Sequence, residues 1–104
     1  MKYVIDIDDT ILFSELLDSG KYEIKYPNKE LIQIITELYK DNNEIILHTA
    51  RHWNHLSITQ NQLSKYSVPY DTLVMGKPVG DCYIDDKGIK PEDFILNYRS
   101  KSNE

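Results

Sequence analysis

Short β-branched runs alternate along this chain with segments of helical periodicity, and that order leaves few folds open. The runs Lys2 to Ile7 and Glu44 to His48 have the length and composition of buried strands. Between them, Asn28 can cap a helix whose apolar side chains, from Leu31 to Tyr39, repeat at helical spacing. The alternation predicts an α/β sandwich around a mainly parallel sheet.

The remaining segments extend the same alternation. A short excursion or a small hairpin is predicted within residues 11–26, and a second helix from His52 to Tyr66, with Trp53, Leu56 and Leu63 turned inward. Further strands are expected at 70–75 and 81–84, before a short helix from Pro91 to Leu96. Only six residues separate Met75 from Cys82, whereas a parallel crossover normally takes a dozen or more. The 70–75 strand is therefore expected to be a marginal edge strand or to pair unconventionally.

The size and charge of the chain exclude several classes of protein. Its 104 residues suit one domain, which we assign to residues 1–98, followed by a flexible polar tail at 99–104. The formal charge of −5 disfavours a nucleic-acid or membrane partner, and the apolar runs are too short for a membrane span. A single cysteine, Cys82, excludes a disulfide framework, so a cytoplasmic protein is expected.

Polar side chains follow the predicted strands where each strand ends. Asp6 and Asp8 lie at the end of the first strand, residues 49–51 follow the second, Lys77 the third, and the Asp85-Asp86 pair the fourth. The carboxyl ends of parallel strands meet at one edge of a sheet, where ligands bind. Clustered carboxylates require a counter-ion, and Mg²⁺ prefers oxygen ligands together with phosphate. The sequence therefore predicts Mg²⁺ and a phosphorylated ligand at this edge.

The spacing of Asp6 and Asp8 supplies two acids with separable roles in phosphoryl transfer. One carboxylate can attack phosphorus and form an aspartyl-phosphate, while the other protonates the leaving alcohol and then deprotonates water. The Lys77 ammonium can offset charge on the phosphoryl oxygens, and the Thr49 hydroxyl can donate to one of them. Asp9 is expected only to brace the turn.

Four motifs stand in the order found in phosphatases of the haloacid dehalogenase (HAD) superfamily, which the chain resembles over residues 1 to about 97. They are VIDIDDT at 4–10, IILHT at 45–49, Lys77, and YIDD at 83–86. The resemblance implies a three-layer, Rossmann-like sandwich and a Mg²⁺-dependent phosphomonoesterase. Residues 11–26 are too few for the cap domain that many members carry, so the site is expected to be open, or covered by a second subunit in a homo-oligomer.

The resemblance also implies a role for each motif residue. Asp6 would be the nucleophile and Asp8 the general acid and base, with Thr49 and Lys77 holding the phosphoryl group. Mg²⁺ would be bound by the Asp6 side chain, the Asp8 backbone carbonyl and the Asp85 side chain. Asp86 would orient Lys77 or a metal-bound water.

The substrate class is less constrained than the chemistry. The motifs at 49–51, 68–71, 76–78 and 83–87 resemble small phosphatases of bacterial capsule polysaccharide synthesis, which implies a sugar or polyol phosphate. The segment from Thr49 onwards also resembles small nucleotidases, so a nucleoside monophosphate is the alternative. Ala50 and Arg51 are expected beside Thr49 and Lys77 at the substrate, although a structural ion pair is an equal alternative for Arg51.

Other functions fit the order of the motifs less well. A receiver domain, a phospho-accepting switch, has similar groups, but its acceptor aspartate lies on a later strand and is followed by threonine and then lysine. His48, His52 and His55 could hint at a transition-metal site, but packed or solvated histidines are favoured. Trp53 is expected to be half-buried in the core, with a substrate contact as the alternative.

Overall fold

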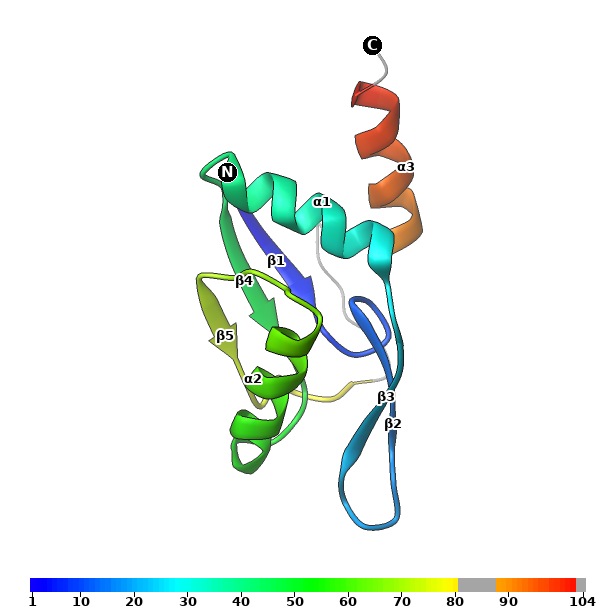
Figure 1. Ribbon diagram of the computed structural model, residues 1–104, viewed down its shortest axis with the longest axis vertical. Helices are drawn as coiled ribbons and strands as arrows, with labels where there is room; N and C mark the ends of the chain where they lie inside the picture. Colours follow the sequence, from blue (N-terminus) through cyan, green and yellow to red (C-terminus); the bar gives the residue numbers. More distant parts are fainter. Residues whose placement is uncertain (81–87, 103–104) are drawn as a thin grey trace.

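A computed structural model describes residues 1–80 and 88–102 of the chain. In these residues the chain forms a small α/β domain with a parallel sheet of strand order β1-β4-β5 (Figure 1). The strands are β1 (Lys2–Asp6), β4 (Glu44–His48) and β5 (Thr72–Val74). Their register aligns Asp6 with His48 and His48 with Val74, so all three strands end at one edge. The strand predicted at 44–48 is confirmed, and the strand predicted at 2–7 is present but ends one residue earlier, at Asp6.

The third strand is shorter than the predicted segment 70–75. It pairs with β4 in the ordinary parallel manner over three residues and lies at the margin of the described sheet. The strand predicted at 81–84, together with Cys82, lies outside the described residues.

The predicted hairpin is present. Strands β2 (Leu12–Leu16) and β3 (Tyr22–Pro27) pair antiparallel and extend past the carboxyl ends of β1 and β4 (Figure 1). Gly20 has a φ of +84°, a conformation that glycine adopts without strain, and it lies in the turn that joins the two strands. The hairpin therefore lies at the edge of the sheet where ligands bind in α/β proteins.

Helix α1 (Lys29–Lys40) begins as the sequence predicts. The Asn28 side chain accepts a hydrogen bond from the Leu31 amide at 3.2 Å and caps the helix. One face of α1 is buried against β4 and the base of the hairpin, which places the core between these elements. The fully buried aliphatic side chains of this core include Ile7, Ile11, Leu12, Ile35, Ile45, Leu47 and Leu63.

The second helix begins later than predicted, and Trp53, which was predicted to lie in it and face inward, precedes it and is exposed. His52 is extended, and its Nδ1 accepts from the Asn54 amide at 3.2 Å, so a 3₁₀ turn, η1 (Trp53–His55), precedes α2 (Leu56–Lys65). The prediction that Trp53 turns inward is wrong, because its side chain is 56% exposed. Leu63 is fully buried, as predicted.

The closing helix α3 (Pro91–Ser102) is longer than the predicted span from Pro91 to Leu96, and it includes residues 99–102 of the predicted tail. Phe94, Ile95 and Tyr98 repeat on one face and pack against the core, which extends the helix beyond Leu96. No helix in the described part of the chain is long and apolar enough to span a membrane.

Candidate functional site

A tight turn after β1 brings Asp8 to the same edge as the loop after β4. The amides of Ile11 and Leu12 both donate to the Ile7 carbonyl, at 2.9 and 3.0 Å. Asp9 has a φ of 60°, a left-handed conformation that aspartate tolerates better than most residues, and its amide donates to the Leu12 carbonyl. Asp9 braces the turn, as expected from the sequence.

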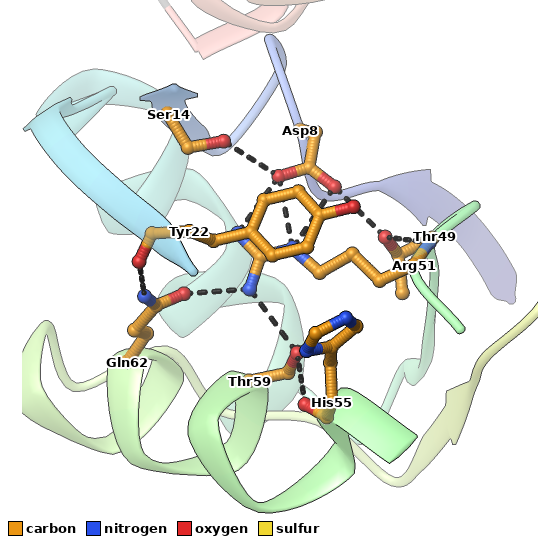
Figure 2. Close-up of polar contacts among 8 residues, drawn as sticks. All are labelled: Asp8, Ser14, Tyr22, Thr49, Arg51, His55, Thr59 and Gln62. Carbon is orange, nitrogen blue, oxygen red and sulfur yellow. Dashed lines mark hydrogen bonds and ion pairs between the residues drawn. The ribbon is translucent and has the colours of Figure 1, made fainter. Parts of the chain in front are cut away.

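The Asp8 carboxylate is held by three side chains, one from the hairpin and two from the loop after β4 (Figure 2). Its Oδ1 accepts from Ser14 Oγ at 2.8 Å and from Arg51 Nη2 at 2.8 Å, while Arg51 Nε lies 3.2 Å from both carboxylate oxygens. Its Oδ2 accepts from Thr49 Oγ1 at 2.8 Å. Such a paired, charge-assisted arrangement fixes the orientation of the carboxylate.

Among the charged groups of the site that the structure describes, Arg51 is the most deeply buried, and its side chain is 0% exposed. Beyond Asp8, its Nη1 donates to Thr59 Oγ1 at 3.1 Å and to Gln62 Oε1 at 2.6 Å. The ring of Tyr22 lies 4.2 Å from the guanidinium carbon and covers it (Figure 2). Of the two roles left open for Arg51 by the sequence, the structural ion pair is the one present.

The same contacts tie the hairpin to α2. Gln62 Nε2 donates to the Tyr22 carbonyl at 2.9 Å, and the Tyr22 ring meets His55 edge-on at 5.3 Å between centroids. Ser14, Tyr22, Thr59 and Gln62 were not singled out from the sequence. Each is an ordinary polar or aromatic residue on its own element, and only the folded chain brings it within reach of Arg51 or Asp8.

Asp6 lies half-buried at the end of β1, with Lys77 and His48 near it. Burial raises the pKa of Asp6 above its usual range, and the negative charge of Asp8 acts in the same direction. The charges of Lys77 and His48 act the other way. Burial, and then Lys77, lowers the pKa of His48. His48 was not predicted to belong to the site, although its position directly opposite Asp6 in the register brings it there.

Lys77 and Thr49 are brought together, as the motif order predicts. The Lys77 amide donates to the Thr49 carbonyl at 2.9 Å, and the Gly76 amide donates to the Arg51 carbonyl at 2.8 Å. Thr49 is fully buried, and its hydroxyl is satisfied there: it donates to Asp8 and accepts from the Arg51 amide at 3.1 Å. Ala50 lies exposed between these two residues.

Of the residues predicted at the metal site, Asp85 and its neighbour Asp86 lie outside the described residues. Within residues 1–80 and 88–102, no three histidine, cysteine, aspartate or glutamate side chains gather as a metal group, and the three histidines do not form one. The two expected donors that are described, the Asp6 carboxylate and the Asp8 carbonyl, are hard oxygen ligands. That donor chemistry fits Mg²⁺, and a cation there would offset the repulsion between Asp6 and Asp8.

A hollow in the described surface lies elsewhere. It opens between β1 and α3, among Tyr3, Phe94 and Tyr98, and none of the described site residues lines it.

The chain was also compared with known proteins. No protein-family model and no curated protein matches it. The crystal structure of an MCSG target from Vibrio cholerae is similar to it, with a TM-score of 0.72 and 25% identity over 97% of this chain and 98% of that one. A chain in the structure of a Pnkp1/Rnl/Hen1 complex is also similar, with a TM-score of 0.57 and 27% identity. That match covers 90% of this chain and 33% of the other.

Proposed function

We propose that this chain is a Mg²⁺-dependent phosphatase of the HAD type, which hydrolyses a small phosphate monoester through an aspartyl-phosphate on Asp6. The observation that supports the proposal most strongly is the meeting of Asp6, Asp8, Thr49 and Lys77 at one sheet edge. Four residues in the order of the family's motifs would have little reason to meet there in an unrelated fold. The proposal includes the finer architecture, a three-layer Rossmann-like sandwich without a cap domain.

In the proposed reaction Asp6 attacks phosphorus in line with the bond to the leaving alcohol. The new bond joins a carboxylate oxygen of Asp6 to phosphorus, the ester P–O bond breaks, and Asp8 gives its proton to the departing oxygen. Asp8 then takes a proton from the water that attacks the aspartyl-phosphate, which releases phosphate and restores Asp6. Lys77 offsets the phosphoryl charge during both steps.

When bound, Mg²⁺ would supply charge neutralisation at the phosphoryl oxygens, held by Asp6, the Asp8 carbonyl and, by resemblance, Asp85. The Thr49 hydroxyl has to turn from Asp8 towards a phosphoryl oxygen in order to donate to the substrate. Arg51 acts through Asp8, since its guanidinium is buried against that carboxylate, and we assign it a positioning role in place of substrate binding.

The experiment that tests the proposal is phosphate release from a panel of sugar phosphates, polyol phosphates and nucleoside monophosphates. Each assay is run with Mg²⁺ and with a chelator, on the unchanged protein and on Asp6→Asn. The variant keeps the shape of the side chain but removes the nucleophile, so turnover should fall on the order of 10³-fold or more. Asp93→Asn, an exposed aspartate on α3, is the matched control and should keep full activity.

Two results would contradict the proposal. Turnover by Asp6→Asn at a rate near that of the unchanged protein would remove the nucleophile assignment. No turnover of any ester, together with slow labelling by acetyl phosphate, would favour the receiver-like switch instead. The third proposed ligand is examined by a metal titration of Asp85→Asn. Loss of this carboxylate should raise the Mg²⁺ concentration that activity requires.

A further inference from the structure

Trp53 is the single tryptophan of the chain, and it lies exposed beside the proposed site. It opens η1, two residues after Arg51, and its side chain is 56% exposed. A Cβ placed on Gly76 would lie 3.4 Å from the indole Nε1 and 3.5 Å from Cδ1. One edge of the indole therefore packs against the backbone at Gly76, while more than half of its surface faces solvent.

The contact with Gly76 places the indole next to the groups proposed to bind phosphate. Gly76 immediately precedes Lys77, and the amides of these two residues donate to the carbonyls of Arg51 and Thr49. The loop that carries Lys77 is thus hydrogen-bonded to the loop that carries Thr49, and the Trp53 indole lies against it at Gly76. Gly76 has a φ of +74°, so the chain at this point favours a residue without a side chain, which leaves room for the ring.

The backbone that carries Trp53 is also held in place. The Asn54 amide donates to His52 Nδ1, and the His55 amide donates to the His52 carbonyl at 2.9 Å. The indole is therefore presented from a closed turn and braced along one edge. An aromatic ring of this size contributes most to stability when buried, so its exposure here brings the core little.

We propose that the exposed indole of Trp53 forms a stacking subsite for the leaving alcohol, and that this alcohol carries a planar base, so the substrate is a nucleoside monophosphate. The inference rests on the proposed phosphatase function and selects among its substrates. A base stacked on an aromatic side chain contributes about 1–3 kcal/mol, and a base presents a larger planar surface to the indole than a sugar or a polyol does. The formal charge of −5 disfavours a long polynucleotide, which leaves the mononucleotide as the ligand of this chemistry.

The first arm of the test uses the fluorescence of Trp53 itself. Asp6→Asn protein with Mg²⁺ is titrated with adenosine monophosphate, with ribose 5-phosphate and with inorganic phosphate. Stacking predicts saturable quenching by the nucleotide and a much smaller change with the other two. Equal responses to all three ligands, or no response to the nucleotide, would overturn the subsite whatever the activity of the enzyme.

The second arm measures KM and kcat for the nucleotide and for ribose 5-phosphate. Trp53→Leu should raise KM for adenosine monophosphate about tenfold, the ratio that corresponds to about 1.4 kcal/mol of lost stacking, and leave ribose 5-phosphate unchanged. Trp53→Phe should recover part of the loss. Tyr39→Leu, an exposed aromatic on α1, serves as the control and should change neither substrate.

The two arms separate the two ways of failing. Turnover of both substrates with equal effects of Trp53→Leu on each would leave the phosphatase proposal standing and remove the stacking subsite. Nucleotide-specific quenching without turnover of any ester would leave the subsite standing and remove the phosphatase proposal.

Discussion

Two arginine–carboxylate pairs of this protein have similar closest distances and opposite surroundings. Arg51 Nη2 lies 2.8 Å from Asp8 Oδ1, and Arg99 Nη2 lies 3.0 Å from Glu30 Oε2. The Arg51 side chain is 0% exposed and has partners on the hairpin, α2 and the first loop, whereas the Arg99 side chain is 55% exposed on α3. Distance alone therefore does not distinguish these two pairs.

Their surroundings predict different contributions. An exposed pair is screened by water and loses side-chain entropy, so it contributes about 0–1 kcal/mol. Burying a guanidinium costs desolvation free energy, which its hydrogen-bond and ion-pair partners must offset. Removing the guanidinium leaves its carboxylate partner without a counter-charge. We therefore expect the many contacts of Arg51 to fix the orientation of Asp8 more than they add to the stability of the fold.

The largest effect is expected for Arg51→Met, which removes the buried charge but keeps much of the side-chain volume. Breaking a buried pair costs about 3–5 kcal/mol, and Asp8 keeps some contact with solvent, so we expect the lower end. Urea denaturation measures the loss of unfolding free energy. Arg51→Lys keeps the charge but not the forked geometry, so a folded Arg51→Lys protein should have a reduced kcat with KM little changed. Full activity in that folded variant would break the assignment of Arg51 to Asp8.

A smaller effect is expected when the guanidinium is uncovered. Tyr22→Leu removes the ring that lies 4.2 Å from Arg51, and a desolvated cation–π contact is worth about 2 kcal/mol. Tyr22→Phe keeps the ring and should retain most of the stability, so the difference between the two variants in thermal denaturation isolates the contribution of the ring. Equal losses in both would show that the contact with the ring face does not matter.

Ser14→Ala tests the hairpin's own contact with Asp8. One hydrogen bond of 2.8 Å is removed while the ion pair remains, so the expected loss of unfolding free energy is about 1 kcal/mol. If Ser14 helps to orient Asp8, kcat should also fall, and Ser14→Thr should recover activity. Ser19→Ala, in the exposed turn of the same hairpin, is the control. A change in stability with no change in kcat would limit Ser14 to a structural role.

The smallest effect is expected for Arg99→Gln. The loss should stay below about 1 kcal/mol and should shrink further in high salt, as for other exposed pairs. Denaturation at two salt concentrations measures both. A loss as large as that of Arg51→Met would erase the contrast between the two pairs.

Much of the fold followed from local patterns. The cap at Asn28, the strands at 2–6 and 44–48 and the hairpin within 11–26 depend on neighbours in the chain, so composition and periodicity predict them. The errors arose where contacts across the fold overrode local preference. The apolar indole of Trp53 predicted an inward side chain, but the His52–Asn54 contact closes a 3₁₀ turn that leaves the indole outside.

The candidate site divides in the same way. Asp6, Asp8, Thr49 and Lys77 could be singled out from the amino-acid sequence because each follows an apolar run, and parallel strands carry such residues to one edge. The partner of Arg51 and the coverage of that pair by Ser14, Tyr22 and Gln62 were decided only by tertiary packing. A buried guanidinium requires hydrogen-bond acceptors from wherever the fold can supply them, and residues up to 43 positions apart met that requirement here.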